Sequence, residues 1–363
     1  MITYQVDFLK EGMLVAENAY SSNGQLIVKA GSILNRQMLS HLKLYQVDEV
    51  AVEEGEPPEE TKRFEALAAE VEATRIKRLT SGPQYQEFLS HYEKELTIVE
   101  RSLNCIILKN ADIDEGSLIQ EATRLMNKDD TAFELIGMLH YMKQIDDSTY
   151  AHSINVGIIA RLLGGWLDYS KEDCDQLTLA GILHDIGKCQ IPEDILFKPG
   201  KLSKMEFEFM KKHPEFGYKL IEDKPLDDRV KQAVLFHHER CDGTGYPIGL
   251  SGDQISEFVS IISVADVYDA MTSARCYRGA LCPFEVIASF EGEGLSKYQP
   301  RVIITFLQKI ANSFLNSDVL LSDSRVATIV FINQRLARPI VRFQDGNFLN
   351  LEEHPDLYIE SII

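Results

Sequence analysis

The sequence has no closely spaced cysteine pairs and no long apolar run. Its six cysteines are scattered without a CxxC spacing, which argues against a disulfide framework or a structural zinc site in a chain of 363 residues. No apolar run approaches the length that spans a bilayer, and acidic residues stand in the N-terminus where a signal peptide would be basic and then apolar. We therefore expect a cytoplasmic protein with reduced thiols and no membrane insertion.

Positive charge is also scarce in this chain. Lysine and arginine together number 37 against 56 acidic residues, which gives a formal net charge of −19. A chain of this charge repels nucleic-acid backbones at long range, so we expect no long DNA or RNA partner. A small anionic ligand remains compatible, because a metal cluster and a few local cations can reverse the sign of the charge inside one pocket.

The hydrophobic pattern divides the chain into four stretches and shows no repeats. Strand-like segments around a hairpin-type turn signal predict a small β-rich N-terminal domain over residues 1–55. Residues 56–139 predict a helical linker region, residues 140–316 a helical domain, and residues 317–363 a small β segment. We therefore predict a mainly α fold, in which a helical bundle core lies between a small β-rich N-terminal unit and a β tail.

Five of the nine histidines occupy inward or junction positions of consecutive predicted helices. A single inward histidine is usually a hydrogen-bonded core residue. Five of them, with acids close by in the sequence, indicate a shared ligand, because buried polar groups need partners. They are His152, His184, His213, His237 and His238.

Carboxylates accompany these histidines. Asp185 directly follows His184 at a predicted helix end, with Lys188 as a nearby cation. Asp266 emerges from an apolar helical stretch, and Asp269 lies one turn later on the same face. A buried carboxylate needs a cation or strong donors. Nitrogen and oxygen ligands without a thiolate suit iron, manganese, zinc or nickel in a multinuclear site.

The run "HHERCDGTGYP" leaves two questions open. Neighbouring helical residues point about 100° apart, so His237 and His238 either both reach one metal at a distorted helix end or take different roles. Glu239 is a candidate acceptor for a histidine N–H group, and it is equally compatible with a solvated acid. The glycines and proline after it predict a turn at the rim of a cleft.

Four motifs, in this order, resemble the HD-GYP family, a branch of the HD superfamily of metal-dependent phosphohydrolases. They are "HDIGK" (184–188), "ILFKPGKLSKMEFEFMKKHPEFG" (195–217), "HHERCDGTGYP" (237–247) and "ADVYDAMTSARCYR" (265–278). The resemblance covers about residues 140–316. It implies an HD-type helical bundle and hydrolysis of the bacterial second messenger cyclic di-GMP to linear pGpG, GMP or both, with attack by a hydroxide shared between metals.

The resemblance also implies the roles of individual residues. Two divalent metal ions are expected, with iron or manganese as the first choice. The ligands of one would be His152, His184, Asp185 and Asp266, and those of the other His213, His237 and His238, with Asp185 bridging. The catalytic residues would be His184, Asp185 and Lys188. The substrate contacts would be Lys188, Arg275 and Arg278 at phosphates and Asp269 near a guanine edge.

Two departures from the family pattern stand in this chain. Ser148 takes the place where some members carry a glutamate that supports a third metal, so a two-metal site is expected. Ala274 and Cys276 flank Arg275 where the family usually has aspartate and proline. The alternatives are a catalytically weak cyclic di-GMP sensor and a phosphodiesterase for a related dinucleotide such as cyclic GMP-AMP. The linker helices are compatible with a homodimer or with packing on their own chain.

Overall fold

The computed structural model divides the chain into two compact units. Residues 1–75, with 323–325 and 363, form the first unit, and residues 76–322 with 326–362 form the second. The residues whose structure is described are 1–10, 12–20, 26–32, 34, 38–39, 42, 47, 49–53, 83–126, 135–139, 149–198, 200–272 and 281–363.

The first unit is a small β structure. Strand β1 (Ile2–Gln5) pairs antiparallel with β4 (Glu49–Val52), and β2 (Ala19–Tyr20) pairs antiparallel with β3 (Leu26–Val28). Apolar side chains that include Val6 and Leu34 form its own core. The predicted hairpin-type turn, between residues 21 and 25, and residues 56–82 of the predicted helical linker region lie outside the described residues.

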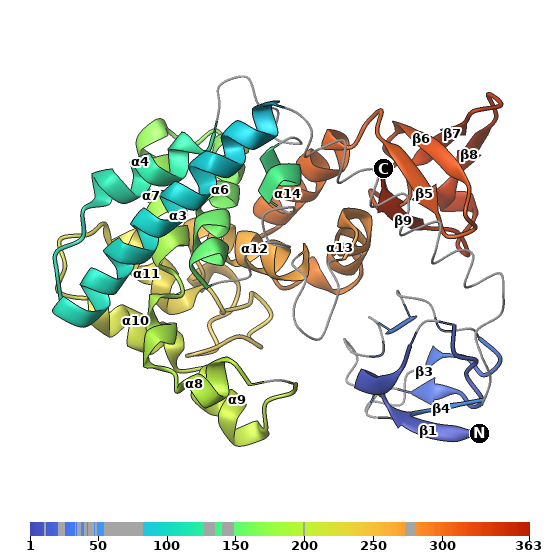
Figure 1. The fold of residues 1–363 in the computed structure, drawn as a ribbon, viewed down its shortest axis with the longest axis horizontal. Helices are drawn as coiled ribbons and strands as arrows, with labels where there is room; N and C mark the ends of the chain where they lie inside the picture. Colours follow the sequence, from blue (N-terminus) through green and yellow to red (C-terminus); the bar gives the residue numbers. More distant parts are fainter. Residues whose placement is uncertain are drawn as a thin grey trace. The chain divides into compact units, whose positions relative to one another are not determined.

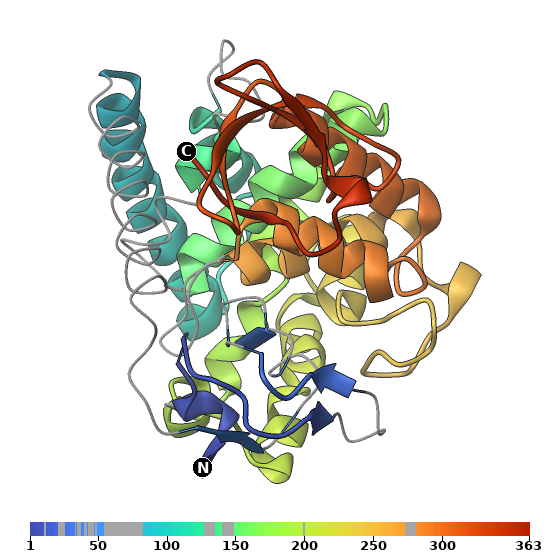
Figure 2. The same cartoon turned by 90° about the vertical axis from the view of Figure 1, so that its right-hand side faces the viewer.

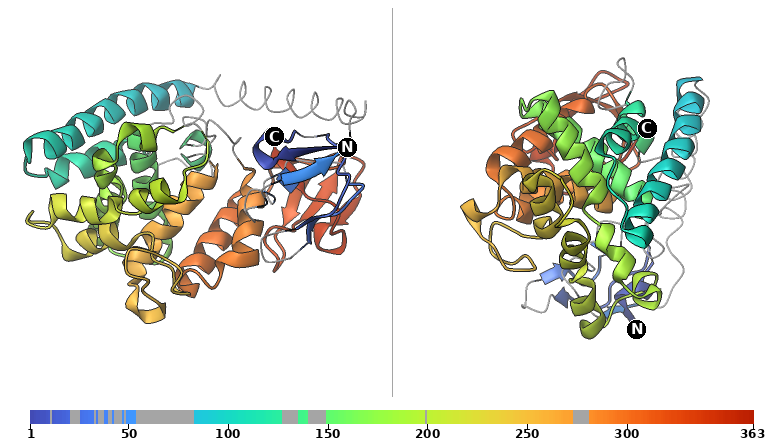
Figure 3. Two further views of the ribbon diagram at one scale, coloured as in Figure 1. Left: turned by 90° about the horizontal axis from the view of Figure 1, so that it is seen from below. Right: turned by 90° about the vertical axis from the view of Figure 1, so that its left-hand side faces the viewer.

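The second unit is mainly helical, as Figure 1 shows. Its helices are α3 (Pro83–Lys109), α4 (Glu115–Arg124), α6 (Thr149–Trp166), α7 (Lys171–Leu183), η2 (Ile186–Gln190), α8 (Glu193–Leu196), α9 (Lys204–Met210), α10 (His213–Ile221), α11 (Asp228–Phe236), η3 (Gly252–Gln254), α12 (Glu257–Thr272), α13 (Pro283–Ser289), η4 (Phe290–Gly294) and α14 (Pro300–Ser313). The long helix α3 runs along one side of the bundle (Figure 3). Among the described helices, none combines the length and the apolar character that a membrane crossing requires.

Helices α6, α7 and α12 form the centre of the bundle. They are buried on nearly all faces, which explains why their apolar residues show little helical periodicity. Helices α6 and α7 cross closely, because a Cβ atom added at Gly181 would lie 2.5 Å from the Cα atom of Gly157. This close crossing brings His152 toward the end of α7, where His184 and Asp185 lie.

The C-terminal residues form a five-stranded antiparallel sheet with the order β8-β7-β6-β5-β9, and its strands curve around one another in Figure 2. The strands are β5 (Asp318–Leu321), β6 (Val326–Phe331), β7 (Ile340–Phe343), β8 (Phe348–Asn350) and β9 (Ile359–Ile362). The predicted turn at Asp345 and Gly346 joins β7 and β8. The predicted fold class, mainly α with small β units at both ends, is confirmed.

Candidate metal centre

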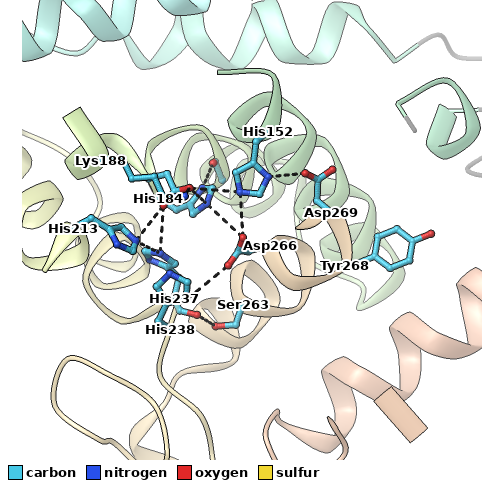
Figure 4. Close-up of polar contacts among 12 residues, drawn as sticks. His152, His184, Lys188, His213, His237, His238, Ser263, Asp266, Tyr268 and Asp269 are labelled. Carbon is cyan, nitrogen blue, oxygen red and sulfur yellow. Dashed lines mark hydrogen bonds and ion pairs between the residues drawn. The ribbon is translucent and has the colours of Figure 1, made fainter. Parts of the chain in front are cut away.

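The seven predicted metal ligands come from five elements or their ends and lie close together in the second unit (Figure 4). Helix α6 carries His152, the end of α7 leads into His184 and Asp185, α10 begins at His213, α11 leads into His237 and His238, and α12 carries Asp266. Two groups of potential ligand atoms, each within 4.8 Å of one another, share Asp185; they are His152, His184 and Asp185, and Asp185, His213, His237 and His238.

Local capping signals fix where these helices begin. The Ser170 side chain accepts a hydrogen bond from the backbone N–H of Asp173 and starts α7, as predicted. A capping box between Ser203 and Glu206 starts α9. Pro214 lies in the first turn of α10, where its missing N–H costs nothing, and this places His213 at the first position of that helix.

Asp185 lies between the two groups of histidines and turns one oxygen to each. Its Oδ2 atom lies 3.2 Å from Nε2 of His184 and 3.5 Å from Nε2 of His152. Its Oδ1 atom lies 3.2 Å from Nε2 of His213 and 3.9 Å from Nε2 of His237. The Asp185 side chain is 2% exposed. A carboxylate placed in this way can bridge two cations.

Asp266 faces the same centre from helix α12. Its Oδ1 atom lies 3.2 Å from Nε2 of His152 and 3.9 Å from Nε2 of His184. Its Oδ2 atom lies 3.9 Å from Nδ1 of His238. Asp266 therefore connects the first group of ligands with His238.

Four of the histidines donate a hydrogen bond through Nδ1. For His152 the acceptor is the carboxylate of Asp269, and for the other three it is a backbone carbonyl. Nδ1 of His184 lies 2.7 Å from the carbonyl oxygen of Gly181, and Nδ1 of His213 lies 2.8 Å from that of Met210. Nδ1 of His237 lies 3.0 Å from the carbonyl oxygen of Val234. A carbonyl oxygen only accepts, so each of these nitrogens carries the proton and each Nε2 atom presents a lone pair to the centre.

The donor set fits a metal better than it fits hydrogen bonds alone. Nε2 of His213 and Nε2 of His237 face each other at 3.3 Å, although both carry lone pairs when Nδ1 is the donor. Nε2 of His184 and Oδ1 of Asp185 are buried and have no hydrogen-bond partner within the described part of the chain. Ligand atoms about 2.1 Å from one ion lie roughly 3.0–3.4 Å apart, which matches these separations. The cluster therefore fits divalent metal binding.

The carboxylates at the centre are held in their charged form. Burial raises the pKa of Asp185, but His184 and Lys188 outweigh that effect and hold it well below its usual value. Burial also raises the pKa of Asp266, and there the neighbouring His152 and His184 side chains lower it well below its usual value. Ionised carboxylates are the form that binds cations.

His237 and His238 are held neutral. Burial, together with His184 and His213, lowers the pKa of His237 to about 3. Burial and His237 lower the pKa of His238 well below its usual value. For His184, burial lowers the pKa, but the charge of Asp185 and its hydrogen bond outweigh burial and raise it. Neutral imidazoles are the form that binds metals.

The predicted substrate contacts have different outcomes. Lys188 lies at the centre, with its Nζ atom 2.5 Å from Oδ2 of Asp185 and its side chain 24% exposed. Asp269 is fully buried, and its Oδ2 atom lies 2.6 Å from Nδ1 of His152. In this position Asp269 supports the His152 ring, and its contact with a guanine edge remains a prediction. Arg275 and Arg278 lie outside the described residues, as do Ser148, Ala274 and Cys276.

Two supporting residues were missed or misassigned from the sequence. The Ser263 hydroxyl on α12 donates to the carbonyl oxygen of His237 at 2.5 Å, and no pattern in the sequence indicates this contact. Glu239 is buried and accepts hydrogen bonds from the backbone of residues 248–250, so it is neither a solvated acid nor an acceptor for a histidine ring. Gly249, which lies within this stretch, is the sequence feature that could have indicated the contact with Glu239.

The matches to known proteins fall in the part of the chain that contains these residues. A family model described as HD domain matches residues 134–302. A cyclic di-GMP phosphodiesterase of Pseudomonas aeruginosa is 36% identical over 190 residues, which are 52% of this chain and 46% of that protein. The 3'3'-cGAMP-specific phosphodiesterase 1 of Vibrio cholerae is 36% identical over 158 residues, which are 42% of this chain and 37% of that protein. The chain thus spans half or less of the length of these curated relatives.

A solved structure shows the same fold. A protein of Bdellovibrio bacteriovorus described as HDG"Y"P aligns with a TM-score of 0.50 at 18% identity, covering 84% of this chain and 97% of that chain. The resemblance predicted from the four motifs is confirmed by these matches.

Proposed function

We propose that this chain, whose residues 134–302 match the family model described as HD domain, is a metal-dependent phosphodiesterase that hydrolyses cyclic di-GMP. The observation that carries the proposal is Asp185, whose two oxygens face two separate groups of histidine nitrogens. A carboxylate between two ligand groups is the arrangement that a two-metal phosphodiester hydrolase requires. The similarity to a cyclic di-GMP phosphodiesterase supports the choice of substrate.

The proposed centre holds two divalent ions. The ligands of the first are His152, His184, Asp185 and Asp266, and those of the second are His213, His237 and His238, with Asp185 shared. Imidazole and carboxylate ligands without a thiolate suit iron or manganese. Two such ions, when bound, lower the pKa of water and neutralise negative charge on a phosphodiester.

The side chains of this chain supply the rest of the chemistry. Lys188 adds a partly exposed cation beside Asp185, where it would contact a phosphate oxygen of the substrate. Asp269 and the backbone carbonyls orient the imidazoles, so that little reorganisation is needed when substrate binds. Arg275 and Arg278 remain predicted phosphate contacts.

Two other functions were considered. The gathered set of seven ligands favours an enzyme over a catalytically weak cyclic di-GMP sensor. Cyclic GMP-AMP is a second candidate substrate, because the relative from Vibrio cholerae that acts on it is as similar in the matched stretch as the relative that acts on cyclic di-GMP. A homodimer, the lack of a long nucleic-acid partner and the choice between pGpG and GMP as product remain predictions.

The test is turnover of cyclic di-GMP by protein loaded anaerobically with Fe(II) or with Mn(II). We expect linear pGpG, GMP or both, separated by chromatography, and a loss of at least about 1,000-fold in rate for a variant with both His184→Ala and Asp185→Ala. A parallel assay with cyclic GMP-AMP compares the two substrates through kcat/KM. Binding of cyclic di-GMP without metal-dependent product would leave only the sensor, and equal turnover by the double variant would refute the assigned site.

A further inference from the structure

Glu239 is the acid that directly follows the two adjacent histidines. It is 1% exposed, and its carboxylate accepts hydrogen bonds from three consecutive backbone N–H groups. The N–H of Ile248 lies 2.7 Å from Oε1, that of Gly249 lies 3.1 Å from both oxygens, and that of Leu250 lies 2.8 Å from Oε2. Hydrogen bonds of this kind compensate the cost of burying the charge.

The three N–H groups converge because the backbone is left-handed at one position. Gly249 has a φ of +78°, a conformation that residues with a side chain rarely adopt. Successive N–H groups then point to the same side of the chain and form a concave anion site. The carboxylate of Glu239 occupies this site and thereby holds residues 248–250 close to His238, its neighbour in the sequence.

The tied segment lies against the metal centre. The backbone N–H of Tyr246 donates to the carbonyl oxygen of His238 at 3.2 Å. The rings of Tyr246 and His238 pack with their centroids 4.6 Å apart and their planes at 31°. Gly245 allows this approach, since a Cβ atom there would lie 2.4 Å from the Cα atom of Glu239.

His238 depends on this packing more than the other histidines do. Backbone carbonyls accept from Nδ1 of His184, His213 and His237. For His238, no ring hydrogen bond is present among the residues described here, and its nearest carboxylate oxygen lies 3.9 Å away. The rings of His237 and His213 also pack against it, with centroids 4.2 and 5.0 Å away, and both belong to the centre itself. Tyr246 therefore supplies the ring contact from outside the centre that takes the place of an acceptor in orienting this imidazole.

The base of the same loop is anchored separately. The N–H of Cys241 donates to the carbonyl oxygen of Lys297 at 2.9 Å, and the N–H of Gly252 donates to that of Cys241 at 2.9 Å. Asp242 and Ser251, the next residues inward along the loop, form a β-bridge with each other. Loss of the Glu239 contacts is therefore expected to free the tip, residues 245–250, and to leave the base closed.

We propose that Glu239 is a positioning residue of the metal centre, which holds residues 245–250 so that Tyr246 fixes the His238 ring as a ligand. The catalytic part of this inference rests on the proposed function. The loop and metal-binding parts do not, because they concern only the conformation and the affinity of the site.

The first measurement is backbone hydrogen exchange, resolved to residues 245–250 and to the loop base. Glu239→Gln keeps the size of the side chain but places an NH2 group against N–H donors. We expect exchange at the tip to become at least about 10-fold faster, with the base unchanged. Asp242→Asn is the matched control, because this exposed acid lies in the same loop and its Oδ1 atom accepts only from Thr244 among the hydrogen bonds described. We expect Asp242→Asn to have the same backbone exchange rates as the wild type.

The second measurement is metal affinity, from competition between the protein and a chelator for Mn(II). We expect Glu239→Gln to weaken one of the two bound ions about 10- to 100-fold, as the loss of a residue that orients a ligand does elsewhere. Excess Mn(II) should then restore most of the kcat of Glu239→Gln. It should not restore that of His238→Ala, in which a ligand itself is missing.

Two results would overturn the inference. Wild-type exchange at the tip in Glu239→Gln would show that the carboxylate does not hold the loop. Faster exchange with unchanged metal affinities would show that the loop does not position His238. If circular dichroism shows that Glu239→Gln does not fold, Glu239→Asp, which keeps the charge, is judged by the same two results. Absence of turnover in the wild type, with loop and metal results as expected, would refute the proposed function and support this inference.

Discussion

At the residue scale, the position of one proton on the His152 ring determines which of its nitrogens is available as a ligand. Its Nδ1 atom lies 2.6 Å from the buried carboxylate of Asp269, and its Nε2 atom faces Asp266 and Asp185. A carboxylate that accepts from one ring nitrogen keeps the proton there and makes the other nitrogen a stronger ligand. Asp269 therefore determines both the tautomer and the basicity of His152.

Replacing Asp269 by asparagine tests this support. Asp269→Asn keeps an acceptor oxygen but removes the negative charge, so we expect one metal ion to bind about 10- to 100-fold more weakly. The measurement is the Mn(II) dissociation constant by competition with a chelator. Asp175→Asn is the control, because Asp175 on α7 pairs with Arg161 on α6 and belongs to neither ligand group. Equal metal affinity in Asp269→Asn and the wild type would show that His152 needs no such partner.

The residues that gather at the centre could be predicted from the sequence, but the contacts that support them could not. Periodicity placed His152 and His237 on inward faces, and the motifs supplied His184, Asp185 and Asp266. The contact of Asp269 with His152 joins residues 117 positions apart, and it depends on how α12 packs against α6. Periodicity within one helix carries no information about such packing.

At the element scale, the close crossing of α6 and α7 sets the distance between the first ligands. A Cβ atom at Gly157 would lie 2.8 Å from the carbonyl oxygen of Thr178, whereas nothing lies within 4 Å of one at Gly165. Both glycines belong to α6, so the same substitution at the two positions separates the effect of packing from that of helix propensity.

Gly157→Ala should force the two helices apart. We expect it to lower the free energy of unfolding by about 1–3 kcal/mol, the usual cost of overpacking. Gly165→Ala should raise it by up to about 1 kcal/mol, because alanine favours a helix. Urea denaturation followed by circular dichroism measures both. Similar stability of the two variants would mean that α6 and α7 do not cross as closely as described.

Helices α3 and α4 bring two acids together beside one cation. Glu95 is 2% exposed, and its Oε2 atom lies 3.7 Å from Nη1 of Arg124, which also pairs with Glu121 at 2.5 Å. Burial, with the hydrogen bond and charge of Glu121, raises the pKa of Glu95 from 4.5 to about 7, although Arg124 opposes the shift.

This raised pKa makes the packing of α3 dependent on pH. Between pH 4.5 and about 7 the folded protein holds a proton on Glu95 that the unfolded chain releases, so the free energy of unfolding falls as the pH rises through this window. Glu95→Gln resembles the protonated form and lacks this dependence. Urea denaturation at about pH 5 and about pH 7.5 should show the wild type losing stability relative to Glu95→Gln. A constant difference between the two proteins would refute the assignment.

At the scale of the whole molecule, the helical bundle and the C-terminal sheet share one hydrophobic core. Val319, Ile329 and Val341 of the sheet belong to the same cluster of buried residues as Phe284 and Phe314 of the helical region. The sequence predicted a small β segment over residues 317–363, but the pairing of β5 with β9, which joins the two ends of this segment, has no signal in the sequence. The predicted four-part division of the chain remains a prediction.

The central claim is that seven side chains from across the helical domain act as one two-metal phosphodiesterase site. The most direct test is the rate of cyclic di-GMP hydrolysis measured while metal-free protein is titrated anaerobically with Fe(II) or Mn(II). We predict that the rate rises until two ions are bound per chain and then stays level. Binding of two ions without hydrolysis, or full hydrolysis with a single ion bound, would contradict the claim.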